Sequence, residues 1–174
     1  MSLLLHPQSK DQYDYFAKDA PQSVLLVAPE GAGKETLLYT LAQEVAGEHS
    51  AGRIFTIEPE PDKQTIGIEQ IRELKVTLRL KSAEHRIIVI PHAEQLTPEA
   101  QNSFLKLLEE PPKGVHFFMA VTKLSDLLET IQSRAIVWRL VLPTNAQIKE
   151  YFKNADERTL AKAVAIGESR IGLI

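Results

Sequence analysis

One stretch of this chain, residues 23–36, combines a short apolar run, a glycine-rich turn and the start of a helical pattern. The run from Val24 to Val27 has no polar side chain, as expected for a parallel strand that helices cover on both faces. Gly31 and Gly33 permit a tight turn after the run, and leucines then recur at helical spacing. The stretch therefore predicts a buried strand, a tight loop and a helix in direct succession.

The turn also carries most of a phosphate-binding loop, whose pattern is GxxxxGK(S/T). Gly33 and Lys34 hold their positions, but Ala28 replaces the first glycine and Glu35 replaces the hydroxyl residue. That hydroxyl normally binds Mg²⁺, and a carboxylate in its place would repel phosphate oxygens. We therefore expect a P-loop fold that binds ATP, ADP or phosphate weakly and holds Mg²⁺ poorly. The alternative is a glycine turn with a structural role alone.

Composition describes an ordinary globular chain. Its 174 residues are 44% hydrophobic, which is enough to bury a full core. Twenty Lys and Arg residues against 23 Asp and Glu residues give no global basic field for nucleic-acid binding. The chain has no cysteine, which excludes disulfides and thiolate metal sites, and no metal site is predicted. Nothing resembles a signal peptide or a membrane span, so we expect a cytoplasmic location.

Strand and helix patterns alternate through most of the chain, which predicts a parallel α/β sheet. The expected strands are Ser23–Val27, Arg53–Ile57, Arg86–Ile90, Val115–Val121 and Ile136–Leu140. Helices are expected at residues 68–80, where apolar residues share one face, and from a Thr97 cap to Pro111.

After residue 142 the pattern changes to helices alone. Thr144 and Gln147 fit a capping box that opens a helix from Ala146 to Phe152, and Asp156 fits the cap of a second helix that ends near Gly167. The final residues look like the opening of a third helix. We therefore predict an α/β domain over residues 1–142 and a small, incomplete helical lid over residues 143–174.

The region from His85 to Ala135 closely resembles the AAA+ core of bacterial DNA polymerase III clamp-loader subunits, in the gamma/tau and delta-prime branch. The resemblance rests on the segment LLEEPP, which is followed by an apolar strand and then by the segment TIQSRA. The similarity extends over nearly the whole chain. It implies a five-stranded parallel sheet in the AAA+ order, a three-helix lid and a C-terminal collar domain that this sequence lacks.

The chain departs from that family's motor subunits where they handle metal and water. Motor subunits end the strand before the LT dipeptide with an Asp-Glu pair, which holds Mg²⁺ and orients the attacking water. Pro91 and His92 occupy those positions here, and Glu94 is expected to point elsewhere after the strand-to-helix turn. Together with Glu35, these replacements argue against ATP hydrolysis by this chain.

A motif that acts on a neighbouring subunit is retained. Ser133, Arg134 and Ala135 match the family's SRC motif, whose arginine reaches into the adjacent subunit's ATP site. By this resemblance, Ser133 and Arg134 form a trans arginine finger. In GTPases, such a finger raises the rate of hydrolysis by roughly 10³ to 10⁵. The alternative is an arginine that pairs with a local carboxylate at a helix end. The candidate nucleotide or phosphate contacts are Gly31, Gly33, Lys34, Thr36, Thr122 (by resemblance, sensor 1) and Arg170 (by resemblance, sensor 2).

The sequence thus predicts a non-hydrolysing, delta-prime-like subunit that requires no cofactor of its own. Its implied partners are the gamma/tau motor subunits and the delta subunit, and, through the complex, the sliding clamp and primer-template DNA. An ATP-hydrolysing gamma/tau-like motor subunit is one alternative. A stand-alone regulatory P-loop protein that binds nucleotide or phosphate is the other.

Overall fold

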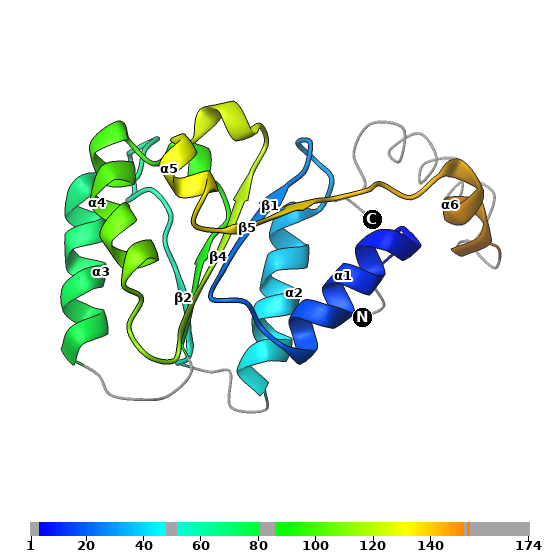
Figure 1. The fold of residues 1–174 in the computed structure, drawn as a ribbon. Coiled ribbons are helices and arrows are strands. Elements are labelled where there is room, and N and C mark those ends of the chain that lie inside the picture. Colours follow the sequence, from blue (N-terminus) through cyan, green and yellow to red (C-terminus); the bar gives the residue numbers. More distant parts are fainter. Residues whose placement is uncertain (1–3, 48–51, 81–85, 152, 154–174) are drawn as a thin grey trace.

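The computed structural model describes residues 4–47, 52–80, 86–151 and 153. Five parallel strands form one sheet in the order β2-β3-β4-β1-β5 (Figure 1). The strands are β1 (Ser23–Val27), β2 (Ile54–Thr56), β3 (Arg86–Ile90), β4 (Val115–Val121) and β5 (Ile136–Arg139). The predicted α/β class and parallel sheet are confirmed. The two edge strands, β2 and β5, are shorter than expected, and each pairs with one neighbouring strand.

Helices connect the strands and lie on both faces of the sheet (Figure 1). They are α1 (Pro7–Lys18), α2 (Lys34–Ala46), α3 (Ile68–Leu80), α4 (Pro98–Glu109), α5 (Glu129–Gln132) and α6 (Asn145–Tyr151), with short 3-10 helices η2 (Ala93–Gln95) and η3 (Leu124–Asp126). No described helix has the length and apolar character that a membrane span requires.

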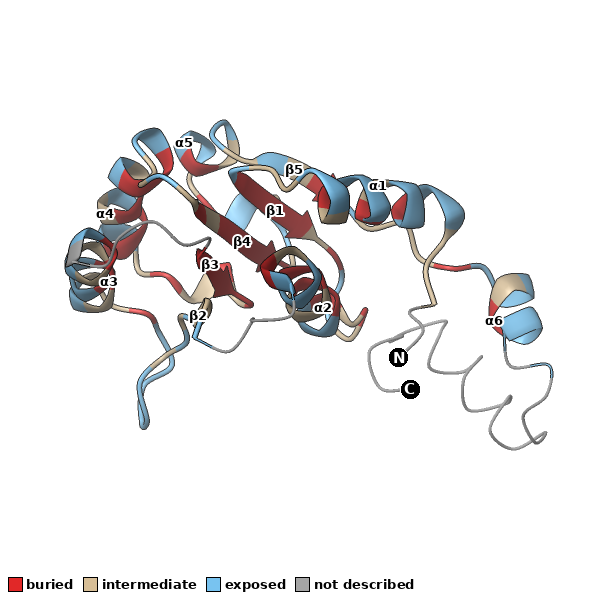
Figure 2. Cartoon of the chain, turned by 90° about the horizontal axis from the view of Figure 1, so that it is seen from below, coloured by how far each residue is buried: buried red, intermediate tan, exposed pale blue. Residues whose placement is uncertain are grey.

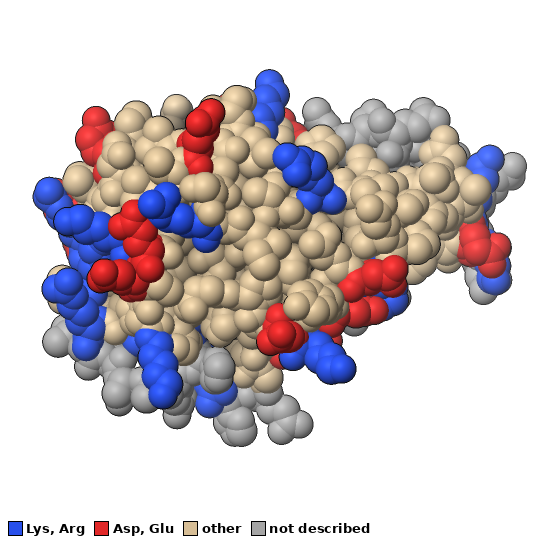
Figure 3. All heavy atoms as spheres, in the orientation of Figure 1, with Lys and Arg blue, Asp and Glu red and all other residues tan. Residues whose placement is uncertain are grey.

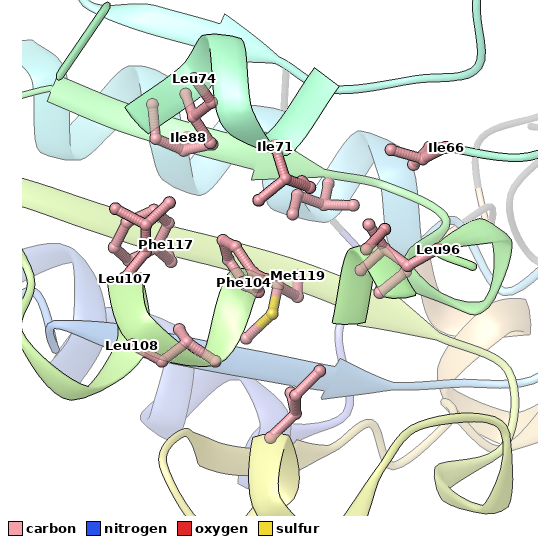
Figure 4. Packing of buried hydrophobic residues seen from close by; sticks show 14 of the residues in the cluster. Ile66, Ile71, Leu74, Ile88, Leu96, Phe104, Leu107, Leu108, Phe117 and Met119 are labelled. Carbon is pink, nitrogen blue, oxygen red and sulfur yellow. The ribbon is translucent and has the colours of Figure 1, made fainter. Parts of the chain in front are cut away.

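The strands alternate their side chains between two cores. Leu25, Ile88 and Phe117 face α3 and α4, whereas Leu26 and Phe118 face α1 and α2. Figure 2 shows the central strands buried between these helical layers. In the first core, Phe104 of α4 meets Phe117 edge-to-face, with ring centroids 5.2 Å apart (Figure 4). Helices therefore cover both faces of the central strands and exclude solvent from them, which explains the largely apolar sequences of these strands.

Helix ends follow the polar signals in the sequence. The Thr97 side chain accepts a hydrogen bond from the backbone amide of Ala100, and proline follows it in the first turn of α4. The capping box predicted at α6 is also present, because Thr144 and Gln147 each accept the other's backbone N–H. The helices predicted beyond residue 153, including the Asp156 cap, lie outside the described residues, and so does Arg170. The division at residue 142 stays a prediction.

Helix α1 was not predicted from the sequence. It is strongly polar and buries only Ser9, Tyr13 and Phe16, so its apolar stripe is narrow. Ser9 is 1% exposed, and its hydroxyl donates to the backbone O of Val141 (3.1 Å) and accepts that residue's N–H (2.9 Å). Helix α1 thus anchors the segment that leads from β5 to α6.

Candidate functional site

The P-loop and two other loops meet above the carboxyl ends of three strands. In the sheet, β4 lies between β1 and β3, and all three run in the same direction. The P-loop follows β1, η2 follows β3, and Thr122 directly follows β4. Groups that are far apart in the sequence are therefore gathered at one edge of the sheet, which is the usual ligand edge of parallel α/β folds.

The P-loop has the backbone shape that its glycines predict. Gly31 and Gly33 adopt φ angles of 77° and 75°, a region that side-chain-bearing residues rarely occupy. Gly33 precedes the first residue of α2, and no side chain caps this helix start. Thr36, a predicted phosphate contact, is exposed in the first turn of α2.

Lys34 is buried and contacts two polar side chains of the protein. Lys34 is only 5% exposed, and its Nζ donates to Thr122 Oγ1 at 2.6 Å. The same Nζ lies 3.5 Å from Glu94 Oε1, and Thr122 Oγ1 also donates to Glu94 Oε1 at 3.3 Å. The structure thus brings together two predicted site residues, Lys34 and Thr122, with a carboxylate from the turn after β3.

The expectation that Glu94 points elsewhere was wrong. The chain turns into η2 directly after β3, so Glu94 returns over the carboxyl edge of the sheet toward Lys34. One of its carboxylate oxygens, Oε2, is buried and has no hydrogen-bond partner among the described residues. Sequence spacing alone carried no sign of this contact, because it depends on the direction of a three-residue turn.

Of the three replaced positions, Glu35 and His92 contact each other and Pro91 lies inside the fold. His92 Nε2 is 2.9 Å from Glu35 Oε1, while His92 Nδ1 is 3.6 Å from Glu94 Oε1. Pro91 is buried and offers no polar side chain. The imidazole therefore lies between two carboxylates, and Glu35 is directed toward His92.

These residues do not fit a magnesium–nucleotide complex. At the hydroxyl position a carboxylate is paired with His92, and at the first acidic position proline has no ligand atom. The P-loop lysine, which would bind phosphate oxygens, already faces the Glu94 carboxylate. Within the described ranges, no three His, Cys, Asp or Glu side chains are grouped as a metal site would require.

Arg134 lies just after α5, where it takes part in a local network. Its Nη2 is 2.7 Å from Glu109 Oε1 at the end of α4, and its Nη1 donates to the backbone O of Thr130 at 2.8 Å. Nη1 also donates to Ser133 Oγ at 3.3 Å, and about a third of the arginine side chain is exposed. The local carboxylate contact considered as the alternative is thus present in the isolated chain.

Gln101, which connects α4 to the segment that carries Arg134, was not among the residues singled out from the sequence. Gln101 is 6% exposed, and its side-chain amide donates to the backbone O of Leu96 (3.2 Å) and of Asp126 (3.3 Å). Its side-chain oxygen accepts the backbone N–H of Leu128 at 2.9 Å. In the sequence, Gln101 has helical spacing to Phe104 and Leu108, which are both buried. A polar residue on that apolar helix face was the signal that could have identified it.

A basic hollow lies between α3 and α4. Its lining includes Arg72, Lys75 and Lys106 together with Glu99 and Ser103. Figure 3 shows many Lys and Arg side chains at this end of the molecule, with acidic ones among them. Burial, and next the positive charge of Lys106, lower the pKa of Lys75, whose Nζ donates to Ser103 Oγ at 2.8 Å. A chain with net negative charge therefore has a local positive surface.

Solved structures with a similar fold belong to the AAA+ proteins. One is a DNA polymerase III gamma subunit-related protein from Thermotoga maritima, with a TM-score of 0.67 and 23% identity over 93% of this chain and 59% of that one. Another is the RuvB Holliday junction branch migration motor from the same organism, with a TM-score of 0.68 and 18% identity over 94% and 56%. The AAA+ fold expected from the sequence is therefore confirmed.

Sequence comparison identifies the family within that fold. The model for "DNA polymerase III, delta subunit" matches residues 12–143. The DNA polymerase III subunit delta' of Yersinia pestis is 32% identical over 145 residues, which cover 71% of this chain and 43% of that protein. The Escherichia coli K12 subunit delta' is 29% identical over 150 residues, covering 74% and 45%. This chain spans less than half the length of these relatives. It belongs to the DNA polymerase III delta subunit family and is similar to the delta' subunits within it.

Proposed function

We propose that this chain is a non-hydrolysing member of a clamp-loader complex that supplies Arg134 to the ATP site of a neighbouring motor subunit. In this role it helps the complex to place a sliding clamp on primed DNA in the cytoplasm. Its partners are the gamma/tau motor subunits and the delta subunit. Its own P-loop is a structural element with weak affinity for ATP, ADP or phosphate.

The position of Arg134 is the observation that carries this proposal. The guanidinium lies at the molecular surface, in the segment between α5 and the edge strand β5. Its pair with Glu109, whose side chain is 46% exposed, is of the surface type that contributes only about 0–1 kcal/mol. Exchanging this carboxylate for a neighbour's phosphate therefore costs little, and the planar guanidinium suits a phosphoryl group well.

The P-loop geometry supports the non-hydrolysing part. Lys34 contacts Thr122 and Glu94, and Glu35 contacts His92, so the groups that would handle a nucleotide and its metal are engaged with one another. Hydrolysis needs a bound metal and an oriented water. Multiple-turnover ATP hydrolysis by the purified chain, abolished by Lys34→Ala, would contradict this part and favour a motor subunit.

The basic hollow between α3 and α4 supports an interaction with DNA phosphates. Lys75 and Lys106 line one open surface with Arg72, and such clusters bind phosphates through charge. We expect Lys75→Ala together with Lys106→Ala to weaken binding of the reconstituted complex to primed DNA. The slope of log affinity against log salt should fall in size by roughly one for each phosphate that the protein no longer neutralises. An unchanged slope would refute this interaction.

The central test compares ATP hydrolysis by complexes reconstituted from the full-length subunit and its motor partners. The variants are wild type, Arg134→Ala, Arg134→Lys and, as a matched control, Arg139→Ala, which removes another exposed arginine from the adjacent strand. Assembly of each complex is checked by size-exclusion chromatography.

We expect both Arg134 variants to assemble and to lose most clamp- and DNA-stimulated hydrolysis, because lysine cannot reproduce a planar guanidinium. The Arg139 variant should keep wild-type turnover. Unchanged turnover with Arg134→Ala would refute the finger. Failure of the wild-type chain to associate with any clamp-loader subunit would favour the stand-alone regulatory alternative.

A further inference from the structure

We infer that Glu94 determines the phosphate affinity of this P-loop by serving as a built-in counter-ion for Lys34. The inference rests on the proposed weak nucleotide site and names the residue responsible for it. It differs from the interpretation that the sequence suggests, in which the carboxylate of Glu35 repels phosphate.

The contacts around Lys34 favour Glu94 over Glu35. Glu94 Oε1 is 3.5 Å from Lys34 Nζ and 3.3 Å from Thr122 Oγ1, while these two side chains are themselves 2.6 Å apart. The carboxylate, ammonium and hydroxyl thus form one closed set of contacts. Phosphate oxygens that approach Lys34 must displace or face this carboxylate.

Burial increases the effect of that charge. Lys34 has a side chain that is 6% exposed and Glu94 one that is 23% exposed, so their interaction is screened less than that of a surface pair. Glu94 Oε2 is buried without a hydrogen-bond partner among the described residues, so this half of the carboxylate has no donor of its own. A second anion close to this carboxylate is therefore strongly disfavoured.

Glu35 lies in a different environment. Its side chain is 51% exposed, and its Oε1 contacts His92 Nε2 at 2.9 Å. Water screens an exposed charge, and the histidine contact directs the carboxylate toward His92. Removing the Glu35 charge should consequently change phosphate affinity far less than removing that of Glu94.

The experiment measures binding of inorganic pyrophosphate, without Mg²⁺ and at low salt, by isothermal titration calorimetry on the full chain. The informative variant is Glu94→Gln, which keeps the shape of the side chain and removes its charge. Glu35→Gln and Glu30→Gln are matched controls, because they make the same change at two other positions of the same loop region. The double variant Lys34→Ala with Glu94→Gln tests whether any gain in pyrophosphate affinity depends on the lysine.

We expect Glu94→Gln to lower the dissociation constant for pyrophosphate about tenfold or more, which corresponds to roughly 1.4 kcal/mol. Glu35→Gln and Glu30→Gln should change it by less than about threefold, and the double variant should lose the gain. Emission of Trp138, which is fully buried, reports whether each variant is folded. Glu94→Ala is expected to show the same gain and decides the question if Glu94→Gln does not fold.

The inference is overturned if folded Glu94 variants bind pyrophosphate no more tightly than Glu30→Gln. A gain that survives loss of Lys34, or an equal gain with Glu35→Gln, would also overturn it. These results leave the proposed function intact, since that depends on turnover in the Arg134 variants. Conversely, ATP hydrolysis by the wild-type chain would contradict the proposed function whatever the Glu94 variants show.

Discussion

Replacing Gln101 with leucine should destabilise the fold by separating α4 from the segment that carries Arg134. The part-buried Leu128 N–H is left without its 2.9 Å acceptor, which costs up to the value of about 1–3 kcal/mol for a fully buried unsatisfied group. The carbonyls of Leu96 and Asp126 lose longer bonds, of 3.2 and 3.3 Å, at about 0.5–1.5 kcal/mol each. Leucine regains part of this by burying apolar surface. The expected fall in the free energy of unfolding is therefore about 2–3 kcal/mol.

Urea denaturation, followed by the emission of the chain's single tryptophan, measures this change directly. Asn102→Leu is the matched control, because Asn102 is exposed on the same helix and donates to the Pro98 carbonyl one turn earlier. We expect the control to change stability by less than about 0.5 kcal/mol. Hydrogen exchange at the Leu128 amide should also accelerate in Gln101→Leu. Equal stability of the two variants, with unchanged exchange, would refute the proposed connecting role.

Three further predictions concern the core, a helix cap and a shifted pKa. Phe104→Ala removes a fully buried ring that packs on Phe117 and should cost about 3–5 kcal/mol in urea denaturation; a loss below about 1 kcal/mol would contradict this packing. Thr97→Ala removes the α4 cap and should cost about 1 kcal/mol by the same measurement, while Thr97→Ser should restore most of it. Burial lowers the pKa of Lys75 below its unfolded value of 10.5, so protonation favours the unfolded state at neutral pH. Lys75→Met should therefore be more stable than wild type at pH 7, and this advantage should shrink as pH rises toward 10.5; an advantage independent of pH would contradict the reasoning.

The sheet, most of the helices and the family were predictable from local sequence patterns. Strands β1, β3 and β4 follow from nearly continuous apolar runs, because a strand covered on both faces buries most of its side chains. The start of α4 follows from Thr97 and a proline, since capping depends on residues within one turn. The turn at Gly31 and Gly33 was predictable for the same reason, because it requires positive φ angles. Helix α1 was missed because its few apolar positions give only a narrow stripe.

Which groups of the site contact one another became clear only from the three-dimensional arrangement. Lys34 and Glu94 are 60 residues apart, and Lys34 and Thr122 are 88 residues apart, yet the order β3-β4-β1 brings the loops that carry them together. The Arg134 contact with Glu109 likewise depends on how α4 and α5 pack. The local sequence pattern indicates which side chains of a segment are buried and which are exposed. The partner of a charged group depends on strand order and on the direction of short turns, which are set by packing across the whole domain.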